Sequence, residues 1–494
     1  MHAVDIIIVI VYLAILLGIG IYFLKKNQSA EDYFVGGRQM GSLHVGLSVV
    51  ATDVGGGFSI GLGGLGFVMG LSGSWMLLTG LVGAWLSAVL LIPRVFSNPK
   101  FRTFTTFPQI LGHFFDSRVA LLAGTISAIG YIGFTSSQIL AGAKLASASF
   151  PGLDMRSALL IMGVIVVSYT ALGGIKAVIY TDTVQWIVLM VGLIFIGLPM
   201  GLISIGGFGA ITETLSSDMV SLTNVGWSTL VNWAFTIIPI WFVGMTLYQR
   251  IFACRDERTA RKAWLIAGLF EWPVMAFMGV TLGLFARVAA EQGTFASIGY
   301  ASSSGLDPEM ALPLFLRTIL PTGLLGLMIS AYFSAIMSTA DSCLMAASGN
   351  VATDLINRFI PIARDEKRFL RICMVLTFVL GALALLLASF MENVLALMLY
   401  SYAFMVSGLL IPVLGGFFWK RSSPTGALWA MLGGGGTTLT LIVSRVSLPF
   451  GLDPNLFGIT VSLIVFVIFS LLWPRRSPPC PEGSSLGESW KTSN

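Results

Sequence analysis

Charged residues are scarce in this sequence. Asp, Glu, Lys and Arg together make up 10% of the 494 residues, whereas apolar residues make up 56%. A soluble domain contains about 25% charged residues, which it needs to cover its core. The composition therefore excludes a soluble enzyme and an intrinsically disordered chain, and it indicates an all-α polytopic membrane protein.

Cysteine and histidine are also scarce. Cys254, Cys343, Cys373 and Cys480 have no paired spacing, and the three histidines are scattered, which excludes a disulfide framework and a zinc site. The sequence has no HExxH motif and no GxSxG motif within a nucleophile elbow, so we expect neither an enzymatic activity nor a bound cofactor. The net charge of +5 comes from short basic clusters between apolar runs, so nucleic acid is not an expected partner.

Apolar runs long enough to cross the ~30 Å core of a bilayer recur along the chain. We predict about thirteen transmembrane helices in a single transmembrane domain over residues 1–473, followed by a mobile cytoplasmic tail over 474–494. The first run lacks a basic region before it and is interpreted as a retained helix. The predicted spans are 4–24, 44–70, 74–93, 118–148, 157–175, 181–206, 228–251, 264–289, 320–350, 370–390, 393–417, 424–445 and 453–473. A short extracellular helix is expected near 306–318.

Basic residues alternate between the loops of this thirteen-helix arrangement. With the N-terminus outside, cytoplasmic segments hold all of the 28 Lys and Arg residues, Arg250 included, except Lys144, Arg156, Arg287, Arg317 and Arg445. Cytoplasmic loops carry an excess of Lys and Arg. We therefore expect an integral protein of a plasma membrane, such as a bacterial inner membrane, with its N-terminus outside and its C-terminus in the cytoplasm.

The second predicted span has a carboxyl group beside three glycines, in the run Ala51-Thr52-Asp53-Val54-Gly55-Gly56-Gly57. Three glycines weaken a helix, and free backbone carbonyls are tolerated in a membrane only where they line a cavity or bind a ligand. We interpret this stretch as a discontinuous helix with a cation or solute site. The alternative is a glycine-packed crossing in which Asp53 snorkels to the interface.

The ninth predicted span has small and hydroxyl-bearing residues on one face. Ala335, Ser338, Thr339 and Ser342 follow the helical spacing i, i+3, i+4, i+7. Hydroxyl and carbonyl oxygens suit a hard cation such as Na⁺, and small side chains allow the broken second span to approach. The alternative is a packing seam of Ser and Thr residues.

Two other carboxyl groups each have two interpretations. Asp182 lies at the predicted start of the sixth span, where an Asp either caps the helix or belongs to an ion site. The residues alone favour the cap. Glu271 lies in the eighth span beside Trp272-Pro273, where it either lines an ion path or hydrogen-bonds a helix freed by the proline.

Pro239 in the seventh predicted span predicts a second break, because proline leaves a carbonyl unpaired and kinks a helix. The second and seventh spans are five spans apart, as in transporters built from inverted five-helix repeats with a site at mid-membrane. We place repeat one near 44–206 and repeat two near 228–417, with 4–24, 424–445 and 453–473 as peripheral helices.

Four segments, taken in order, resemble the sodium/solute symporter family, with features near its sodium/proline and choline transporter branches. They are Glu31-Asp32-Tyr33-Phe34-Val35-Gly36-Gly37-Arg38, Gly173 through Asp182, Tyr248-Gln249-Arg250-Ile251, and Ala335 through Ser342. The resemblance implies a thirteen-helix inverted-repeat symporter fold, with Na⁺ as the coupling ion and a small solute and the bilayer as partners.

The resemblance also implies ion ligands. Carried over by position, the sodium ligands are the backbone oxygens of Ala51, Val54 and Ala335 and the hydroxyls of Ser338 and Thr339. Asp182 matches an acidic family position tied to sodium coupling, which replaces the cap interpretation. A second ion position is implied near Asp182, Asp341 and Ser342 together with Ser338. Asp341 stands where some members have a hydroxyl, so it strengthens this second site or carries a proton.

The solute is left between two classes. Asp53 matches an Asp of sodium/proline transporters, whereas the run Val54 to Phe58 resembles choline transporters, with Asp53 in place of their Trp. Choline needs an aromatic cage, to which Trp75, Trp227, Trp233 and Trp241 are candidates. The candidate solute-binding residues are Asp53, Gly55, Gly56, Phe58, Trp75, Gln138 and Trp233.

We therefore expect a secondary active transporter that couples Na⁺ to an amino acid such as proline or an organic cation such as choline by alternating access. The coupling between the two ligands is typically ~1–3 kcal/mol. The main alternative is proton coupling through Asp53, Asp182 or Asp341, since a desolvated carboxyl group can hold a proton. A channel would need a repeated filter sequence or charged rings, and a membrane-embedded enzyme would need a catalytic cluster; the sequence has neither.

Overall fold

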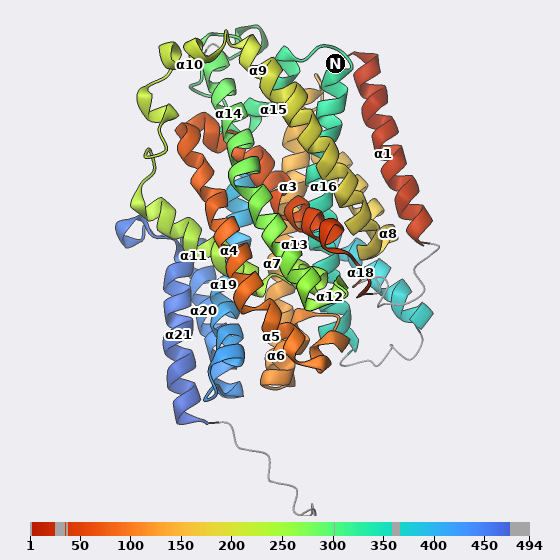
Figure 1. Cartoon of the computed structure of the whole chain (residues 1–494), viewed down its shortest axis with the longest axis vertical. Helices are drawn as coiled ribbons and strands as arrows, with labels where there is room; N and C mark the ends of the chain where they lie inside the picture. The colour runs from red at the N-terminus through yellow and green to blue at the C-terminus, as the bar shows by residue number, and fades with distance from the viewer. Residues whose placement is uncertain (1, 25–34, 36–37, 301, 358–365, 475–494) are drawn as a thin grey trace, which may run out of the picture.

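The computed structural model of the chain describes residues 2–24, 35, 38–300, 302–357 and 366–474. These residues form a bundle of helices, most of which run along the long axis of the molecule (Figure 1). An isolated parallel bridge joins Met40 and Cys254, and the described residues contain no named strand. The predicted tail over 474–494 lies outside the described residues after residue 474, as does most of the family segment at 31–37.

The helices match the predicted spans closely in most places. The long helices are α1 (Ala3–Leu24), α3 (Ser42–Met69), α4 (Trp75–Leu90), α7 (Ser117–Ser149), α8 (Met155–Gly192), α11 (Trp227–Val243), α13 (Glu257–Leu269), α14 (Ala276–Glu291), α16 (Leu324–Gly349), α18 (Glu366–Ala388), α19 (Val394–Phe418), α20 (Pro424–Ser444) and α21 (Pro454–Leu472). The shorter ones are α5 (Ile92–Ser97), α6 (Phe107–Phe114), α9 (Leu198–Ser204), α10 (Phe208–Thr214), α12 (Met245–Ala253) and α15 (Pro308–Ile319). The last of these is the short helix predicted near 306–318.

Length and hydropathy identify an integral membrane protein. In the described part of the chain, nine helices are long and apolar enough to cross a membrane, or ten if the bent pair α11 and α12 counts as one span. Ala3–Ile19 and Met155–Ser168 are apolar but shorter. The count of thirteen spans and their orientation stay predictions.

We predicted a loop between the spans 157–175 and 181–206, but this stretch is helical. Helix α8 covers this stretch and continues through a π-helical turn, Leu193–Gly197, into α9. A straight helix of this length would be about 75 Å long, more than twice a bilayer core. The stretch therefore has the length for both spans, and its second part, Val178–Ser204, is apolar enough to be one by itself.

Two of the long helices are interrupted. Helix α3 contains a non-helical residue, Gly55, with φ 3° and ψ −165°, as the glycine run predicted. The seventh span is also broken, but α11 continues through Pro239 and bends by 41° at Gly244, where α12 follows. The predicted break is confirmed, and its predicted position at the proline is wrong by five residues.

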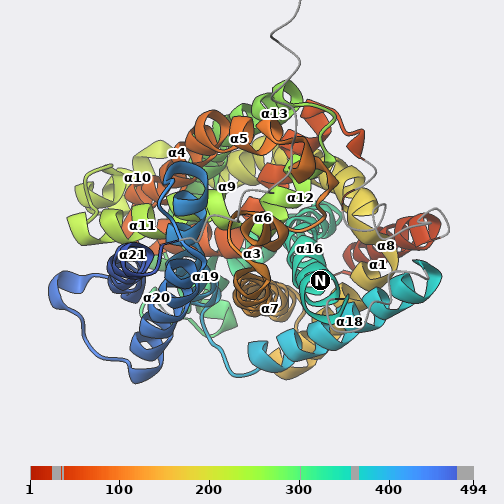
Figure 2. The same cartoon turned by 90° about the horizontal axis from the view of Figure 1, so that it is seen from below.

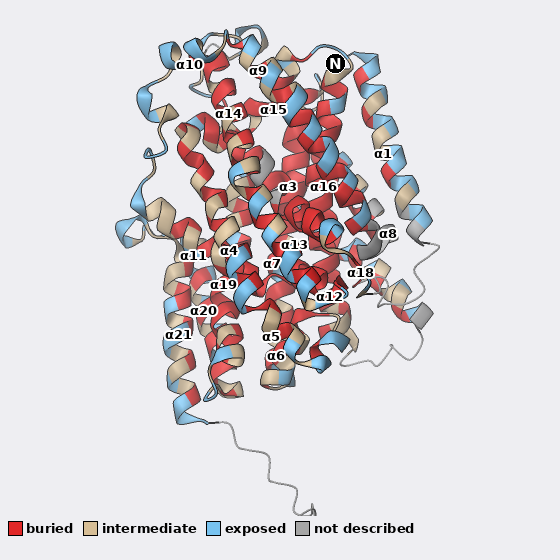
Figure 3. Cartoon of the chain, viewed as in Figure 1, coloured by how far each residue is buried: buried red, intermediate tan, exposed pale blue. Residues whose placement is uncertain are grey.

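Helix α16 is the centre of the molecule. Its membrane-spanning apolar stretch is 89% buried inside the molecule, and α3, α7 and α8 pack against it. The outer helices α1 and α21 expose much of their surface and lie at opposite edges of the bundle (Figures 2 and 3). Broken helices thus meet a buried, hydroxyl-rich helix in the interior, away from the exposed apolar rim.

Helices α3 and α14 approach each other closely through glycine. A Cβ atom on Gly66 would lie 2.1 Å from the carbonyl oxygen of Val280, and one on Gly283 would lie 2.0 Å from the carbonyl oxygen of Gly63. Both neighbours are backbone atoms, which cannot turn aside as a side chain can. The crossing therefore requires glycine at both positions.

Candidate ion and solute site

The break in α3 is held open by a side chain from α7. The backbone N–H of Gly56 donates a hydrogen bond of 2.6 Å to Oε1 of Gln138. In a continuous helix this N–H would bond to the carbonyl of Thr52, four residues earlier. Gly55 leaves no room for a side chain, since a Cβ there would lie 2.3 Å from Oγ1 of Thr339. The carbonyl of Thr52 is consequently available to a partner outside its own helix.

Helix α16 supplies that partner. Oγ1 of Thr339 donates to the carbonyl of Thr52 at 2.8 Å and lies 3.2 Å from the carbonyl oxygen of Ala51. Oγ of Ser338 lies 3.1 Å from the same Ala51 oxygen. Both hydroxyls also lie within 3.4 Å of the carbonyl oxygen of Ala335.

Four of the five predicted sodium ligands therefore gather at one place: Ala51, Ala335, Ser338 and Thr339. The fifth, Val54, precedes the break in α3, and its side chain lies outside the described residues. Thr52, which was not predicted as a ligand, contributes a further carbonyl oxygen. A buried group of carbonyl and hydroxyl oxygens without an ionised member is a set of hard donors that suits a monovalent or divalent hard cation.

Arg250 lies beside this group of oxygens and is completely buried. Its guanidinium donates to Oδ2 of Asp182 at 3.1 Å, to Oγ of Ser342 at 2.8 Å and to Oγ1 of Thr52 at 2.5 Å. It also donates to Oγ of Ser48 at 3.0 Å. An arginine buried at this depth requires such a set of acceptors, because an unpaired buried charge is very unfavourable.

The three residues predicted for a second ion, Asp182, Asp341 and Ser342, lie around this arginine. Asp182 is in the interior of α8, where it accepts from Ser48 and Arg250, so the helix-cap interpretation is wrong. Asp341 is fully buried, and neither of its carboxyl oxygens has a hydrogen-bond partner. Its charge lies within electrostatic reach of both Asp182 and Arg250.

Sequence reasoning missed Arg250 as a site residue. It placed this residue among the cytoplasmic loop charges, because it follows a long apolar run. The available signal was the family-like segment Tyr248-Gln249-Arg250-Ile251, in which all four residues are buried. The cluster around Arg250 is joined to the sodium-ligand group through Ser342, whose hydroxyl donates to the carbonyl of Ser338 at 2.8 Å.

A pair of carboxyl groups lies near the α3 break. Asp53 on α3 and Glu271 interact directly, and the hydroxyl of Tyr402 on α19 also lies close to Asp53. Glu271 is held in a π-helical turn, Phe270–Met275, that joins α13 to α14 and contains the non-helical residue Trp272. Both carboxyl groups are buried. The pair brings Glu271, whose role the sequence left open, to the residue predicted to bind solute.

The predicted solute-binding residues divide into two groups. Asp53, Gly55, Gly56 and Gln138 lie together at the break of α3. Trp75, the first residue of α4, does not join them, because its indole N–H donates a hydrogen bond to the carbonyl of Leu222.

Of the remaining two predicted solute residues, only Trp233 has a described side chain. Trp233 is buried on α11, and no contact places it against the break. The preceding residue, Asn232, bonds to Gly451 and Asp453 in the connection before α21. The side chain of Phe58 lies outside the described residues. The predicted aromatic contribution to the solute site is therefore not assembled by the described contacts.

A buried ion cluster connects three helices far from Arg250. Lys144 on α7, which the sequence placed on the outer side, is buried and pairs with Asp307 at 2.6 Å and Glu309 at 2.7 Å. Glu309, on α15, also accepts hydrogen bonds from the backbone N–H groups of Val394 and Leu395 at the start of α19. The cluster therefore ties α7, α15 and α19 together.

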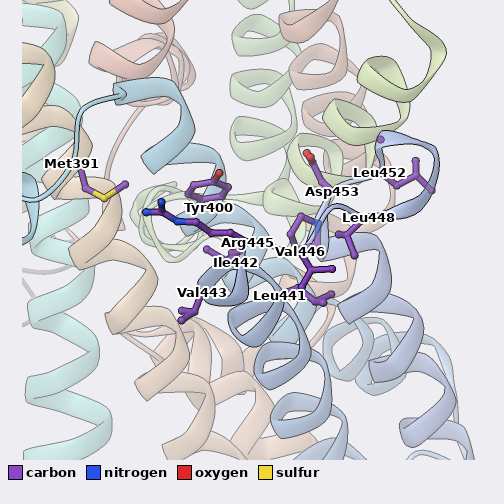
Figure 4. Close-up of a pocket in the computed structure, with 12 residues that line it drawn as sticks. Met391, Tyr400, Leu441, Ile442, Val443, Arg445, Val446, Leu448, Leu452 and Asp453 are labelled. Carbon is purple, nitrogen blue, oxygen red and sulfur yellow. The ribbon is translucent and has the colours of Figure 1, made fainter.

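A cavity of about 740 Å³ lies between α19, α20 and the start of α21 (Figure 4). Tyr400, Arg445 and Asp453 line it, with mainly aliphatic side chains around them. Partial burial raises the pKa of Asp453 above its ordinary value. None of the predicted ion or solute residues lines this cavity, so it is separate from the site described above.

The chain as a whole is similar to known transport proteins. The model of the sodium:solute symporter family matches residues 33–434. The chain is 27% identical to the osmoregulated proline transporter OpuE of Bacillus subtilis, with 94% of each chain covered. It is 28% identical to the sodium/proline symporter of Escherichia coli (94% and 92% covered) and 26% identical to the sodium/pantothenate symporter of the same organism (93% and 94% covered).

Solved structures show the same fold. A Na⁺-coupled sialic acid symporter in a substrate-bound, outward-open state matches with a TM-score of 0.76 and 21% identity, covering 96% of this chain and 99% of that one. Mhp1, a nucleobase-cation-symport-1 family transporter, matches in a closed conformation with a TM-score of 0.57 and 15% identity (90% and 94% covered).

Proposed function

This chain belongs to the sodium:solute symporter family, and we propose that it is a secondary active transporter in which Na⁺ moving down its gradient drives uptake of a small organic solute. It is a transporter protein and not an enzyme. The proposal for its mechanism rests on residues of this chain, taken in turn below.

One observation carries the proposal for the ion. The hydroxyls of Ser338 and Thr339 meet carbonyl oxygens that the break at Gly55 makes available in α3. Such an arrangement binds a cation only while α3 and α16 are in contact. A bound Na⁺ would therefore stabilise the conformations in which these two helices touch, and its loss would weaken them. This differential stabilisation is what coupling to a conformational change requires.

The breaks in α3 and at Gly244 support two inverted repeats, near 44–206 and 228–417, with α1, α20 and α21 outside them. Interrupted helices at equivalent places in two repeats mark the mid-membrane site of such transporters. Rocking of one group of helices against the rest of the bundle would expose the site alternately to the two sides. We also propose the predicted orientation, with the N-terminus outside, because it places most Lys and Arg residues in cytoplasmic segments.

Arg250 bears on how many ions are carried. Its guanidinium holds Asp182, Ser48 and Ser342, so it supplies a fixed positive charge at the second ion position that the resemblance implied. Asp341 adds a further acidic group to this position, where it would serve a second Na⁺ or a proton. We propose Na⁺ at the group formed by Ala51, Ala335, Ser338 and Thr339 as the coupling ion, with proton coupling through Asp341 as the second candidate.

For the solute we propose an amino acid of the proline type, with an organic cation such as choline as the alternative. The support is Asp53 at the break of α3 and the similarity to proline transporters. The pantothenate symporter is nearly as similar to this chain as the proline transporters are. Overall sequence identity therefore does not decide the solute, which depends on the side chains at the break.

The proposal is tested by the thermal stability of the purified protein. A ligand that binds only the folded state raises stability by RT ln(1 + [L]/Kd), about 2.7 kcal/mol at 100 Kd. A panel of amino acids, quaternary amines, organic acids and sugars is measured in NaCl and in KCl at equal ionic strength. We expect an amino acid of the proline type to stabilise the protein in NaCl and much less in KCl. Equal stabilisation in both salts would contradict Na⁺ coupling for that solute.

A further inference from the structure

The carboxyl pair of Asp53 and Glu271 is deeply buried and poorly satisfied. Asp53 is 7% exposed and Glu271 is 0% exposed. Oδ2 of Asp53 and both carboxyl oxygens of Glu271 receive no hydrogen bond of good geometry. Among the described residues, no Lys, Arg or His forms an ion pair with either group.

This pair differs from the other buried acidic groups of the chain. Asp182 is paired with Arg250, and Glu309 is paired with Lys144 and with two backbone N–H groups. Asp53 and Glu271 have only each other and Tyr402. Since the interior solvates charge poorly, two adjacent carboxyl groups without a cation are unfavourable. The arrangement is therefore suited to a ligand that brings positive charge.

The surroundings place the pair where a solute would be held. Asp53 is two residues before the break of α3, and Glu271 is carried by the irregular turn between α13 and α14. Gly80 on α4 faces Glu271, and a Cβ at this glycine would lie 2.0 Å from Oε2 of Glu271. Tyr402 adds α19. Four elements thus converge on the two acidic groups, and Asp53 directly follows Ala51 and Thr52, whose carbonyl oxygens meet the hydroxyls of Ser338 and Thr339.

We propose that Asp53 and Glu271 together bind the cationic nitrogen of the solute, and that this makes the transporter selective for solutes that carry an ammonium group. This inference rests on the proposed function and specifies the chemical class of its substrate. Amino acids and quaternary or protonated amines fit the pair, whereas a solute whose only charge is negative would be repelled by it. The transported Na⁺ and the solute cation would then bind at neighbouring residues of α3.

The experiment measures binding to the full-length protein in lipid nanodiscs by calorimetry in NaCl. Choline is compared with dimethylbutanol, its uncharged carbon analogue, and L-proline with tetrahydrofuroate, which has oxygen in place of the ring nitrogen. Pantothenate is the anionic probe. We expect binding of at least one nitrogen-containing member, at least 10-fold weaker binding of its analogue, and no preference for the anion.

The variants separate this charge readout from the ion site. Glu271→Gln should weaken binding of the nitrogen-containing probe at least 10-fold and leave the Na⁺-induced stabilisation unchanged. Glu271→Asp should restore part of the affinity, because it keeps the charge. Glu257→Gln is the matched control, since Glu257 lies exposed at the start of α13 in an i,i+4 pair with Arg261, and it should leave binding unchanged.

Several results would overturn the inference. An uncharged analogue that binds as well as its cation would do so, as would an anion as the preferred ligand, or full affinity in Glu271→Gln. If that variant does not fold, the comparison of analogues on the unaltered protein still decides the question. Failure of all nitrogen-containing probes, on protein that Na⁺ stabilises, also counts against it. Solute binding that does not depend on Na⁺ would instead contradict the proposed Na⁺ coupling. The preference for a cationic solute would still be decided by the comparison of each solute with its uncharged or oxygen analogue.

Discussion

The side-chain carbonyl of Gln138 on α7 accepts the backbone N–H of Gly56 on α3 at 2.6 Å. This hydrogen bond replaces the helical one that Gly56 would make to Thr52, whose carbonyl instead accepts from Thr339. A residue that contacts no ion thereby controls which backbone oxygens are available to one. The relationship links the side chain predicted to bind solute with the oxygens predicted to bind Na⁺.

Replacement of Gln138 by Ala should therefore weaken Na⁺ binding. The variant leaves the buried N–H of Gly56 without a partner, at about 1–3 kcal/mol, and allows α3 to close its helical bond. We expect the Na⁺ concentration for half-maximal uptake in proteoliposomes to rise roughly 10-fold. Gln292→Ala, at the far end of α14, is the control and should not change it. An unchanged Na⁺ dependence in Gln138→Ala would show that the break does not depend on this bond.

The hydroxyls of Ser338 and Thr339 should matter individually. Loss of either ligand oxygen should cost about 1–2 kcal/mol of ion binding, which raises the half-maximal Na⁺ concentration roughly 5–30-fold. Ser330→Ala is a matched control on the same helix, because Ser330 is buried and its hydroxyl donates only to the carbonyl of Gly326. If Ser338→Ala and Thr339→Ala both behave like this control, the sodium site lies elsewhere.

Asp182 and Arg250 should depend on each other for stability. Asp182→Asn leaves the buried guanidinium without its carboxylate, and the loss of one partner of a buried pair costs about 3–5 kcal/mol. The double variant Asp182→Asn with Arg250→Gln removes both charges and should recover a large part of that loss. Thermal unfolding of Asp182→Asn, of Arg250→Gln and of the double variant measures how much stability each loses relative to the unaltered protein. Additive effects would argue that the two residues act independently.

The two acidic partners of Lys144 should not be equivalent. Glu309 has a side chain that is 5% exposed and holds two backbone N–H groups of α19 as well as the lysine, whereas the side chain of Asp307 is 38% exposed. We expect Glu309→Gln to lower the free energy of unfolding by about 2–4 kcal/mol and Asp307→Asn by about 1 kcal/mol or less. If thermal denaturation showed equal losses of stability in the two variants, Glu309 would not be the more important partner of Lys144.

The crossing of α3 and α14 should reject any side chain. Gly283→Ala would place its Cβ 2.0 Å from the carbonyl oxygen of Gly63, and the shift this forces should destabilise the protein by about 1–3 kcal/mol. Gly436→Ala in α20 is the matched control, because nothing lies within 4 Å of its Cβ position. Alanine there should be neutral or stabilising by up to about 1 kcal/mol. A stable Gly283→Ala protein would show that the two helices can separate at little cost.

Features with a local cause were predictable from the sequence. The break at Gly55 follows from three successive glycines, and the oxygens of Ser338 and Thr339 follow from helical spacing on one apolar span. The gathering of Ala51 with these two hydroxyls came from the family resemblance, and the structure places them together. The helical predictions were accurate for the same reason, since long apolar runs dominate this composition.

Features that depend on distant partners were not predictable. Arg250 resembles a loop charge until α3, α8 and α16 surround it, because its partners Ser48, Asp182 and Ser342 are far away in the sequence. Pro239 was the more conspicuous residue of its span, but the bend lies at Gly244, which adopts an extended conformation with φ −69° and ψ 116°.

The Lys144 cluster also determines which parts of the molecule can separate. If α15 moved away from α19, two N–H groups at the start of α19 would lose their acceptor, and if it moved away from α7, Lys144 would lose both of its charge partners. Each of these separations would leave buried polar groups without a partner. The three helices α7, α15 and α19 should thus travel as one rigid body through the transport cycle, and a boundary between moving parts must be sought elsewhere in the bundle.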